Sequence, residues 1–170
     1  MKKTALPILI SLLLLFSACG RPAAVRFEPV RYFTADLSLE NGDYIIEGRL
    51  VCNAYDDIRL SFTHPAMLRF FTVRAASEGF FTEVAGVPDT IEARIVPTFA
   101  PVNVLCVALR RAVFENNEFT RAEDGGYAAS IPIGGRTATV KFDADGYITG
   151  IDCPETKLKV KFIIKIIDNR

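Results

Sequence analysis

The residue types needed for acyl transfer occur together in one short stretch, where Ser61 and His64 follow Asp57. His64 is the only imidazole in the chain, so it is the only histidine that could serve as the base of a triad. Side chains on a β-strand alternate between two faces, so Asp57 and Ser61 share one face and His64 points to the other. The chain also lacks a Gly-x-Ser-x-Gly turn that would present a nucleophile. We therefore interpret His64 as a strand-end residue before Pro65.

A second stretch, DADG at 143–146, carries carboxylates of the kind that bind calcium. An EF-hand loop beginning at Asp143 needs Gly at its sixth position and Glu at its twelfth, and these positions hold Ile148 and Pro154. The sequence instead favours a hairpin turn. The glycine pairs at 125–126 and 134–135 are also interpreted as turns, because neither opens a helix as a phosphate-binding loop does. We expect no metal and no cofactor.

Three cysteines lie in the body of the chain, namely Cys52, Cys106 and Cys153. They are far apart and form no Cys-x-x-Cys motif. An odd number allows at most one internal disulfide, and small buried thiols are the favoured interpretation. Four lysines share one face of the last predicted strand: Lys157, Lys159, Lys161 and Lys165. They could meet lipid head groups, but a solvated face with lysines guarding a sheet edge is favoured.

The start of the chain has the order of a secretory signal. A basic segment, Met1–Lys3, precedes an apolar run, Ala5–Phe16, and then the small residues Ser17 and Ala18. The run is shorter than the roughly 20 residues that a membrane-spanning helix needs. Phe16-Ser17-Ala18-Cys19 resembles a bacterial lipobox, with Phe where Leu is usual. The resemblance implies cleavage before Cys19 and a diacylglyceryl group on its sulfur, and the alternative is an ordinary signal with a coincidental cysteine.

Removal of a signal peptide at 1–18 leaves 152 of the 170 residues, the size of one domain. The loss of Lys2 and Lys3 reduces the 20 basic side chains to 18, against 20 acidic ones. This balance gives no basic surplus for nucleic acid. Residues 19–30 are expected to be the lipidated N-terminus and a tether, and residues 31–170 the domain. The expected location is the extracytoplasmic face of a cell membrane.

The domain has mainly the two-residue period of strands, interrupted by turn signals such as Asn41-Gly42-Asp43. The predicted strands are 31–39, 44–52, 57–64, 68–76, 79–85, 118–123, 127–133, 136–143, 147–152 and 157–167. Residues 87–89 are predicted to be a loop. One segment has helical spacing, and Pro101 suits a first helical turn, so a helix is predicted over 101–115.

Nine or ten antiparallel strands with one helix predict a mainly β, α+β fold. A sheet of that width curls strongly, which gives a half-open β-barrel with the helix against the sheet. The concave side is then filled by the helix or holds a ligand.

The order of elements over about 31–167 resembles the LolA/LolB-like family of lipoprotein carriers and related lipoproteins, which have a half-open β-barrel. The segment FTADLSLENGDYIIEGRL at 33–50 is similar to the family's first hairpin, and LSFTHPAML at 60–68 to its strand before a bend. PVNVLCVALRRAV at 101–113 occupies the place of its mid-chain helix, and residues 140–162 resemble its closing hairpin. The resemblance implies an apolar concave face that binds acyl chains, and it assigns no particular ligand residue.

Two functions therefore stand ahead of the rest. The first is a non-enzymatic lipoprotein, anchored through Cys19, that binds a lipid or another apolar ligand in the half-barrel. The alternative is an anchored protein–protein interaction module of the cell envelope with no small ligand. An envelope hydrolase ranks last, because no nucleophile–base pair is identifiable.

Overall fold

The computed structural model describes residues 27–53, 57–76, 79–85, 87–92 and 100–165, which form a mainly β fold with one long helix. The strands are β1 (Phe33–Asn41), β2 (Tyr44–Asn53), β3 (Asp57–His64), β4 (Phe71–Ala76), β5 (Gly79–Val84), β6 (Val87–Glu92), β7 (Thr120–Arg121), β8 (Tyr127–Ile133), β9 (Arg136–Phe142), β10 (Ile148–Cys153) and β11 (Leu158–Lys165). The helix is α2 (Ala100–Phe114), and two 3₁₀ turns are η1 (Ala66–Leu68) and η4 (Pro154–Thr156).

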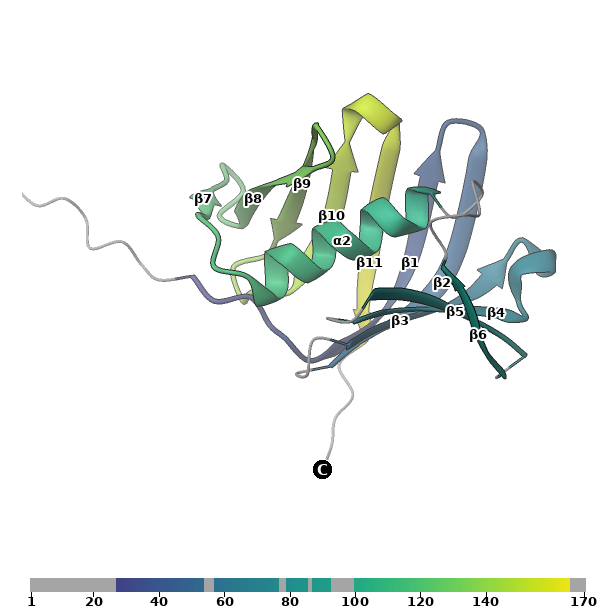
Figure 1. Ribbon diagram of the computed structural model, residues 1–170. Coiled ribbons are helices and arrows are strands. Elements are labelled where there is room, and N and C mark those ends of the chain that lie inside the picture. Colours follow the sequence, from purple (N-terminus) through teal and green to yellow (C-terminus); the bar gives the residue numbers. More distant parts are fainter. Residues whose placement is uncertain (1–26, 54–56, 77–78, 86, 93–99, 166–170) are drawn as a thin grey trace, which may run out of the picture.

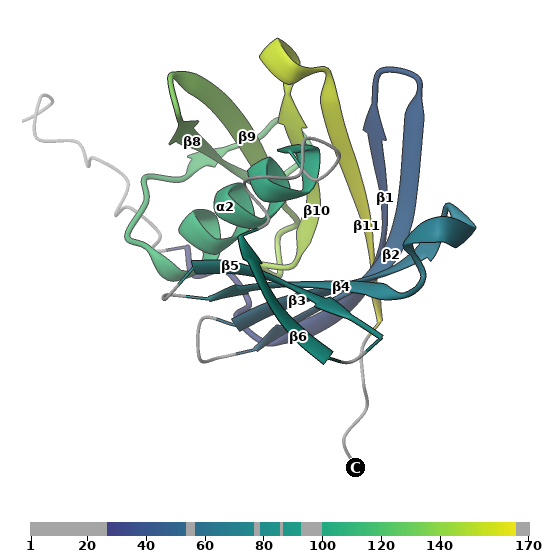
Figure 2. The same ribbon diagram turned by 45° about the vertical axis from the view of Figure 1, so that its right-hand side comes forward.

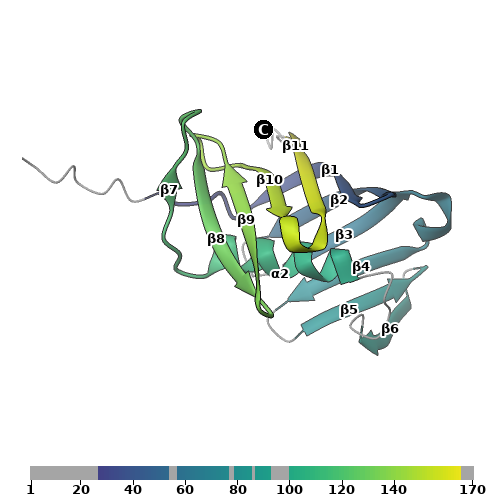
Figure 3. The same cartoon turned by 90° about the horizontal axis from the view of Figure 1, so that it is seen from above.

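All the strands belong to one antiparallel sheet in the order β6-β5-β4-β3-β2-β1-β11-β10-β9-β8-β7. Each half is a run of neighbouring hairpins, and the two halves meet where β1 pairs with β11 (Figure 1). Figure 3 shows this sequence of strands from above, from β7 at one edge to β6 at the other. The first and last strands therefore lie side by side in the middle of the sheet.

Each predicted strand overlaps an observed one, and β3 and β8 have the predicted bounds. The strands predicted at 68–76 and 118–123 are shorter, and residues 166–167 of the last predicted strand lie outside the described residues. The predicted loop at 87–89 is wrong, because these residues begin β6, with Val87 opposite Val84 and Pro88 opposite Glu83. Proline cannot donate a ladder hydrogen bond, but β6 is an edge strand and tolerates it. With β6 the described residues form a sheet of eleven strands rather than nine or ten.

The core lies between the sheet and α2. Along β1 the inward residues are buried and the intervening ones are not, as the period of two predicts. The helix buries one face, made by Val102, Leu105, Cys106, Ala108, Leu109, Ala112 and Val113. The helix predicted over 101–115 is confirmed to within one residue at each end.

One helix contacts strands from both halves of the sheet. It packs against β8, β9 and β10 on one side and against β4 on the other (Figure 2). In the sheet order β4 and β8 are seven places apart, so α2 joins distant strands.

The chain enters the domain along the β7–β9 end. The Phe27 ring stacks on Tyr127 at 4.1 Å between ring centroids and also contacts Phe119 and Phe142. The Val30 N–H donates to the Gly146 carbonyl at 2.9 Å. Residues at the end of the predicted tether are thus held against the domain.

Candidate functional site

An apolar cleft of about 580 Å³ opens beside the N-terminus of α2. Its walls come from the β1–β2 hairpin, the η1 turn and the first turn of the helix. Its apolar lining includes Tyr44, Ile45, Ile46, Met67, Leu68 and Val104. This volume lies within the range of about 300–1,000 Å³ that is usual for ligand sites.

The rim of the cleft leaves large apolar side chains in water. Tyr44 and Met67 are each 75% exposed and Ile45 is 53% exposed, whereas Ile46 and Leu68 beneath them are buried. Phe70, just after η1, is also 68% exposed. A cluster of exposed apolar residues around a concavity is typical of a binding site, whereas scattered single ones are ordinary.

A second cavity of about 370 Å³ lies farther along α2, between the helix and the residues where β4 ends and β5 begins. Ala75, Ala76 and Phe80 line it from the sheet, and Asn103, Val107 and two arginines line it from the helix. The Nη1 of Arg111 donates to the Pro132 carbonyl at 2.6 Å. The Glu115 Oε1 is 3.8 Å from Arg110 Nη1 and 3.9 Å from Arg111 Nε.

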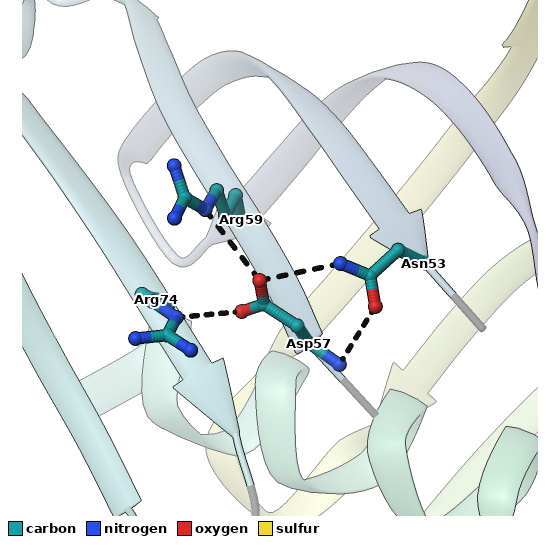
Figure 4. A network of polar contacts seen from close by, with 4 residues as sticks. All are labelled: Asn53, Asp57, Arg59 and Arg74. Atoms are coloured by element: carbon teal, nitrogen blue, oxygen red, sulfur yellow. Dashed lines mark hydrogen bonds and ion pairs between the residues drawn. The ribbon is translucent and has the colours of Figure 1, made fainter. Parts of the chain in front are cut away.

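Asp57 joins a polar network on the outer face of the sheet (Figure 4). Its Oδ1 accepts from Arg74 Nε at 2.8 Å, and its Oδ2 lies 3.6 Å from Arg59 Nε. Asn53 donates to Oδ2 at 3.2 Å and accepts from the Asp57 N–H at 3.3 Å. Arg59 and Arg74 lie directly opposite each other on β3 and β4, so Asp57 offsets the repulsion between their charges.

The candidate triad is not assembled. The Asp57 carboxylate is held by arginines, and the Ser61 hydroxyl lies 3.4 Å from that of Thr72. His64 is exposed at the far end of the same strand, about 23 Å from Asp57 at 3.3 Å per residue. The interpretation of His64 as a strand-end residue is confirmed.

The DADG segment forms the predicted turn between β9 and β10. The Asp143 Oδ1 accepts from the N–H of Asp145 at 3.0 Å and of Tyr147 at 2.9 Å, and Gly146 has φ of 90°. One carboxylate oxygen of Asp143 thus accepts hydrogen bonds from within the turn. Within the described parts of the chain no three His, Cys, Asp or Glu side chains come together as metal ligands.

The lysines of the last strand do not guard an edge, because β11 lies between β1 and β10. The Nζ of Lys165 instead lies 2.5 Å from Asp36 Oδ2, and the Nε of Arg49 donates to Asp36 Oδ1 at 3.2 Å. The hydrogen bond from Lys165 lowers the pKa of Asp36, with a further contribution from Arg49. Lys159 and Lys161 face outward and are exposed, as expected of a solvated face.

Cys52, Cys106 and Cys153 are buried thiols, so the buried-thiol interpretation is confirmed. Burial raises the pKa of Cys106 to about 12, which leaves it protonated near neutral pH. The Cys153 thiol donates to Glu155 at 3.6 Å. The pKa of Glu155 is lowered, first by its own backbone N–H and then by that of Thr137.

The lipidation residue Cys19 and the signal at 1–18 lie outside the described residues. Within the part of the chain that is described, no helix is long and apolar enough to cross a membrane. No protein-family model matches the chain, and a search of curated proteins gives no match either.

The sequence alone assigned no ligand-binding residue. The rim of the cleft, with Tyr44 and Ile45, was therefore not predicted. Tyr44 and Ile45 stand within a predicted strand, where apolar residues indicate core. One signal was present, because the run Tyr44-Ile45-Ile46 breaks the alternation directly after a turn. Two adjacent apolar residues cannot both face the core, so one of them had to be exposed or part of a site.

Proposed function

We propose that this protein is a membrane-anchored lipoprotein, attached through Cys19, that binds a lipid or another apolar ligand without catalysing a reaction. The observation that carries the proposal is the cleft with its exposed rim of Tyr44, Ile45 and Met67. Burial of that rim by a ligand would remove apolar surface from water, at about 25 cal/mol per Å².

The contacts of α2 support the half-open β-barrel that this proposal includes. Seven strand spacings of about 4.8 Å place β4 and β8 about 34 Å apart in a flat sheet. The helix has 15 residues, a length of about 22 Å, yet it packs against both strands. A strongly curled sheet accounts for these contacts, and its concave side would then hold both the helix and the ligand.

The first experiment is native mass spectrometry of the mature chain with Cys19→Ser, purified without detergent. We expect a reproducible extra mass in the lipid range, and fragmentation would identify the ligand. A clean protein mass that also takes up no added fatty acid or phospholipid would contradict the proposal. That outcome would favour the alternative, an anchored interaction module whose apolar rim contacts a protein.

A matched pair of variants ties the result to the cleft. Val104→Trp places a large ring in the cleft and should abolish the extra mass. Val51→Trp adds the same ring on β2 at an exposed position outside the cleft lining and should leave the mass unchanged. Equal loss in both variants would show that the bound mass does not occupy this cleft.

A further inference from the structure

A groove on the outer face of β9, β10 and β11 has a lysine on either side of a glycine. Gly150 of β10 lies directly opposite Lys141 of β9 and Lys161 of β11. Both lysines are exposed and stand between buried neighbours, so they point to the outer face. Because glycine has no side chain, the face is hollowed between them, and a shallow groove of about 200 Å³ includes all three residues. We call it the lysine groove.

The two lysines of this groove have no carboxylate opposite them in the strand register. The other partner of Lys141 is Ala128 on β8, and the other partner of Lys161 is Ser38 on β1. Neighbouring strands are about 4.8 Å apart, so the two lysines leave the sheet about 10 Å from each other. A phosphate group above the glycine could therefore contact both ammonium groups.

The other lysines of the outer face have acidic neighbours. Lys159 also lines the groove, but Asp152 lies opposite it on one side and Glu40 on the other. Lys165 forms an ion pair with Asp36. The positive charge that attracts an anion is therefore concentrated at the lysine groove.

The chain that leads from the predicted anchor joins the domain beside this groove. The Val30 N–H donates to the Gly146 carbonyl in the turn between β9 and β10. The same turn connects Lys141 to Thr149, and both residues line the groove. The segment at 20–31 adds three arginines and one glutamate. Positive charge is thus found both in the segment nearest the membrane and at the place where that segment meets the sheet.

We propose that the outer face of β9, β10 and β11 lies on the membrane that holds the anchor, with phosphates of anionic lipid head groups bound between Lys141 and Lys161. This inference rests on the proposed function, because it requires attachment through Cys19, and it adds the orientation of the domain. Each lysine near an anionic bilayer strengthens binding about fivefold. The anchor raises the effective concentration of lipid at the groove, so two lysines are enough to orient the domain.

This orientation has a consequence for the apolar cleft. The helix α2 packs on the opposite face of the sheet from the lysine groove (Figure 1). The cleft lies beside that helix, so it would be on the side of the sheet remote from the bilayer. A ligand would then reach the cleft from the aqueous side.

The test uses the mature chain coupled through the Cys19 thiol to a maleimide phospholipid in vesicles, which keeps the tether at its natural length. The other cysteines are buried, so coupling is directed to Cys19. One set of vesicles is phosphatidylcholine alone, and the other also contains phosphatidylglycerol. We expect acetylation of Lys141 and Lys161, followed by mass spectrometry, to be about fivefold slower on the anionic vesicles. Lys157, an exposed lysine outside the groove, is the internal control and should react equally on both.

A pair of variants at one position separates charge from shape. Thr149→Glu places a carboxylate in the groove and should restore acetylation on anionic vesicles to the rate on phosphatidylcholine. Thr149→Gln has nearly the same size without the charge and should behave as the wild type. High salt should also restore acetylation, because it screens exposed charges.

Equal acetylation of the wild type on both kinds of vesicle would overturn this inference and favour an acidic protein as the partner of the groove. Protection that persists in Thr149→Glu would overturn it too. Chemical coupling replaces natural acylation in this test, so either result leaves the proposed function standing. The proposed function fails separately, if Cys19 carries no lipid in cells or the cleft binds no apolar ligand.

Discussion

Asp57 shows how a single carboxylate organises the outer face of the sheet. Its side chain is only 15% exposed, and it lies between two arginines that face each other across β3 and β4. Ion pairs that are partly withdrawn from water are more strongly coupled than exposed ones. Asp57 therefore belongs to the structure of the sheet, although sequence spacing made it a candidate for catalysis.

We predict that Asp57→Ala lowers the free energy of unfolding by about 1–3 kcal/mol, because the carboxylate that lies between Arg59 and Arg74 would be lost. Asp36→Ala is the control, since Asp36 also bridges two cations but has a 40% exposed side chain. Asp36→Ala should lower the free energy of unfolding by less than about 1 kcal/mol, because exposed ion pairs contribute little. Urea unfolding of the variants measures both values. Equal losses would refute the special role of Asp57.

The contribution of Asp36 to the stability of the fold depends on pH. The pKa of Asp36 is lowered from its ordinary 3.8, so the folded state releases this proton more readily than the unfolded state. Its contribution to stability is present above pH 3.8 and is lost as the pH falls through the lowered folded pKa. The difference between wild type and Asp36→Ala should therefore shrink in acid.

We predict that the thiols of Cys52, Cys106 and Cys153 resist a thiol reagent in the folded protein and react fully in denaturant, because all three are buried. The folded pKa of Cys106 is raised from 9.0 to about 12, so only the unfolded chain ionises this thiol between those values. Stability from Cys106 is thus full below pH 9 and falls as the pH rises toward 12. The measurement uses the mature chain with Cys19→Ser, and rapid modification of one equivalent at pH 8 would contradict this prediction.

At the scale of elements, alternation and turn residues determine most of what could be predicted. Asn41-Gly42-Asp43 located the first hairpin, and the apolar spacing after Pro101 located α2. The strand β6 escaped prediction because Pro88 argues against a strand unless the strand is known to be an edge. The second cavity escaped too, because a row of residues on α2 becomes a site only when β4 and β5 pack beside it.

The turn between β9 and β10 provides a prediction at this scale. Gly146 has φ of 90°, and a Cβ there would lie 2.9 Å from the Glu28 carbonyl oxygen. Gly146→Ala should therefore destabilise the protein by about 1–3 kcal/mol and release residues 27–30. Trypsin cleavage after Arg31 should become faster, which limited proteolysis measures.

Gly134→Ala is the control for this turn. Gly134 also has positive φ, 54°, but a Cβ there would meet nothing within 4 Å. Gly134→Ala should lower the free energy of unfolding by only about 1 kcal/mol, the cost of placing a side chain at a positive φ. Cleavage after Arg31 should be unchanged. Identical behaviour of the two variants would show that Gly146 does not hold the incoming chain.

At the scale of the whole molecule, the contacts of Phe27 and Val30 with the β7–β9 end fix where the chain enters the domain. Cys19 and Phe27 are eight positions apart in the sequence, a separation of at most about 29 Å when the chain is fully extended. The cleft lies by Asn41, at the opposite end of β1 from the strand start at Phe33. A chain anchored at Cys19 would therefore keep the domain close to the membrane.

We predict that Cys19→Ser moves the protein from the membrane fraction to the soluble extracytoplasmic fraction, because two or more acyl chains are needed for stable anchoring. Fractionation followed by immunoblotting measures the shift, and metabolic labelling with palmitate should label the wild type alone. Cys52→Ser is the control, since Cys52 is buried in the domain. Unchanged membrane association of Cys19→Ser would refute the lipid anchor.

The pairing of β1 with β11 has a consequence for how the chain acquires its structure. Thr34 lies opposite Lys165, so the central ladder joins residues separated by nearly the whole domain. Such high contact order slows folding, since a large loop must close before the contact forms. During ribosomal synthesis β1 emerges long before β11, so the side of β1 that faces away from β2 stays unpaired until β11 has been made. A nascent chain arrested before β11 would expose the backbone edge and the apolar face of β1, so truncated products should aggregate or be degraded.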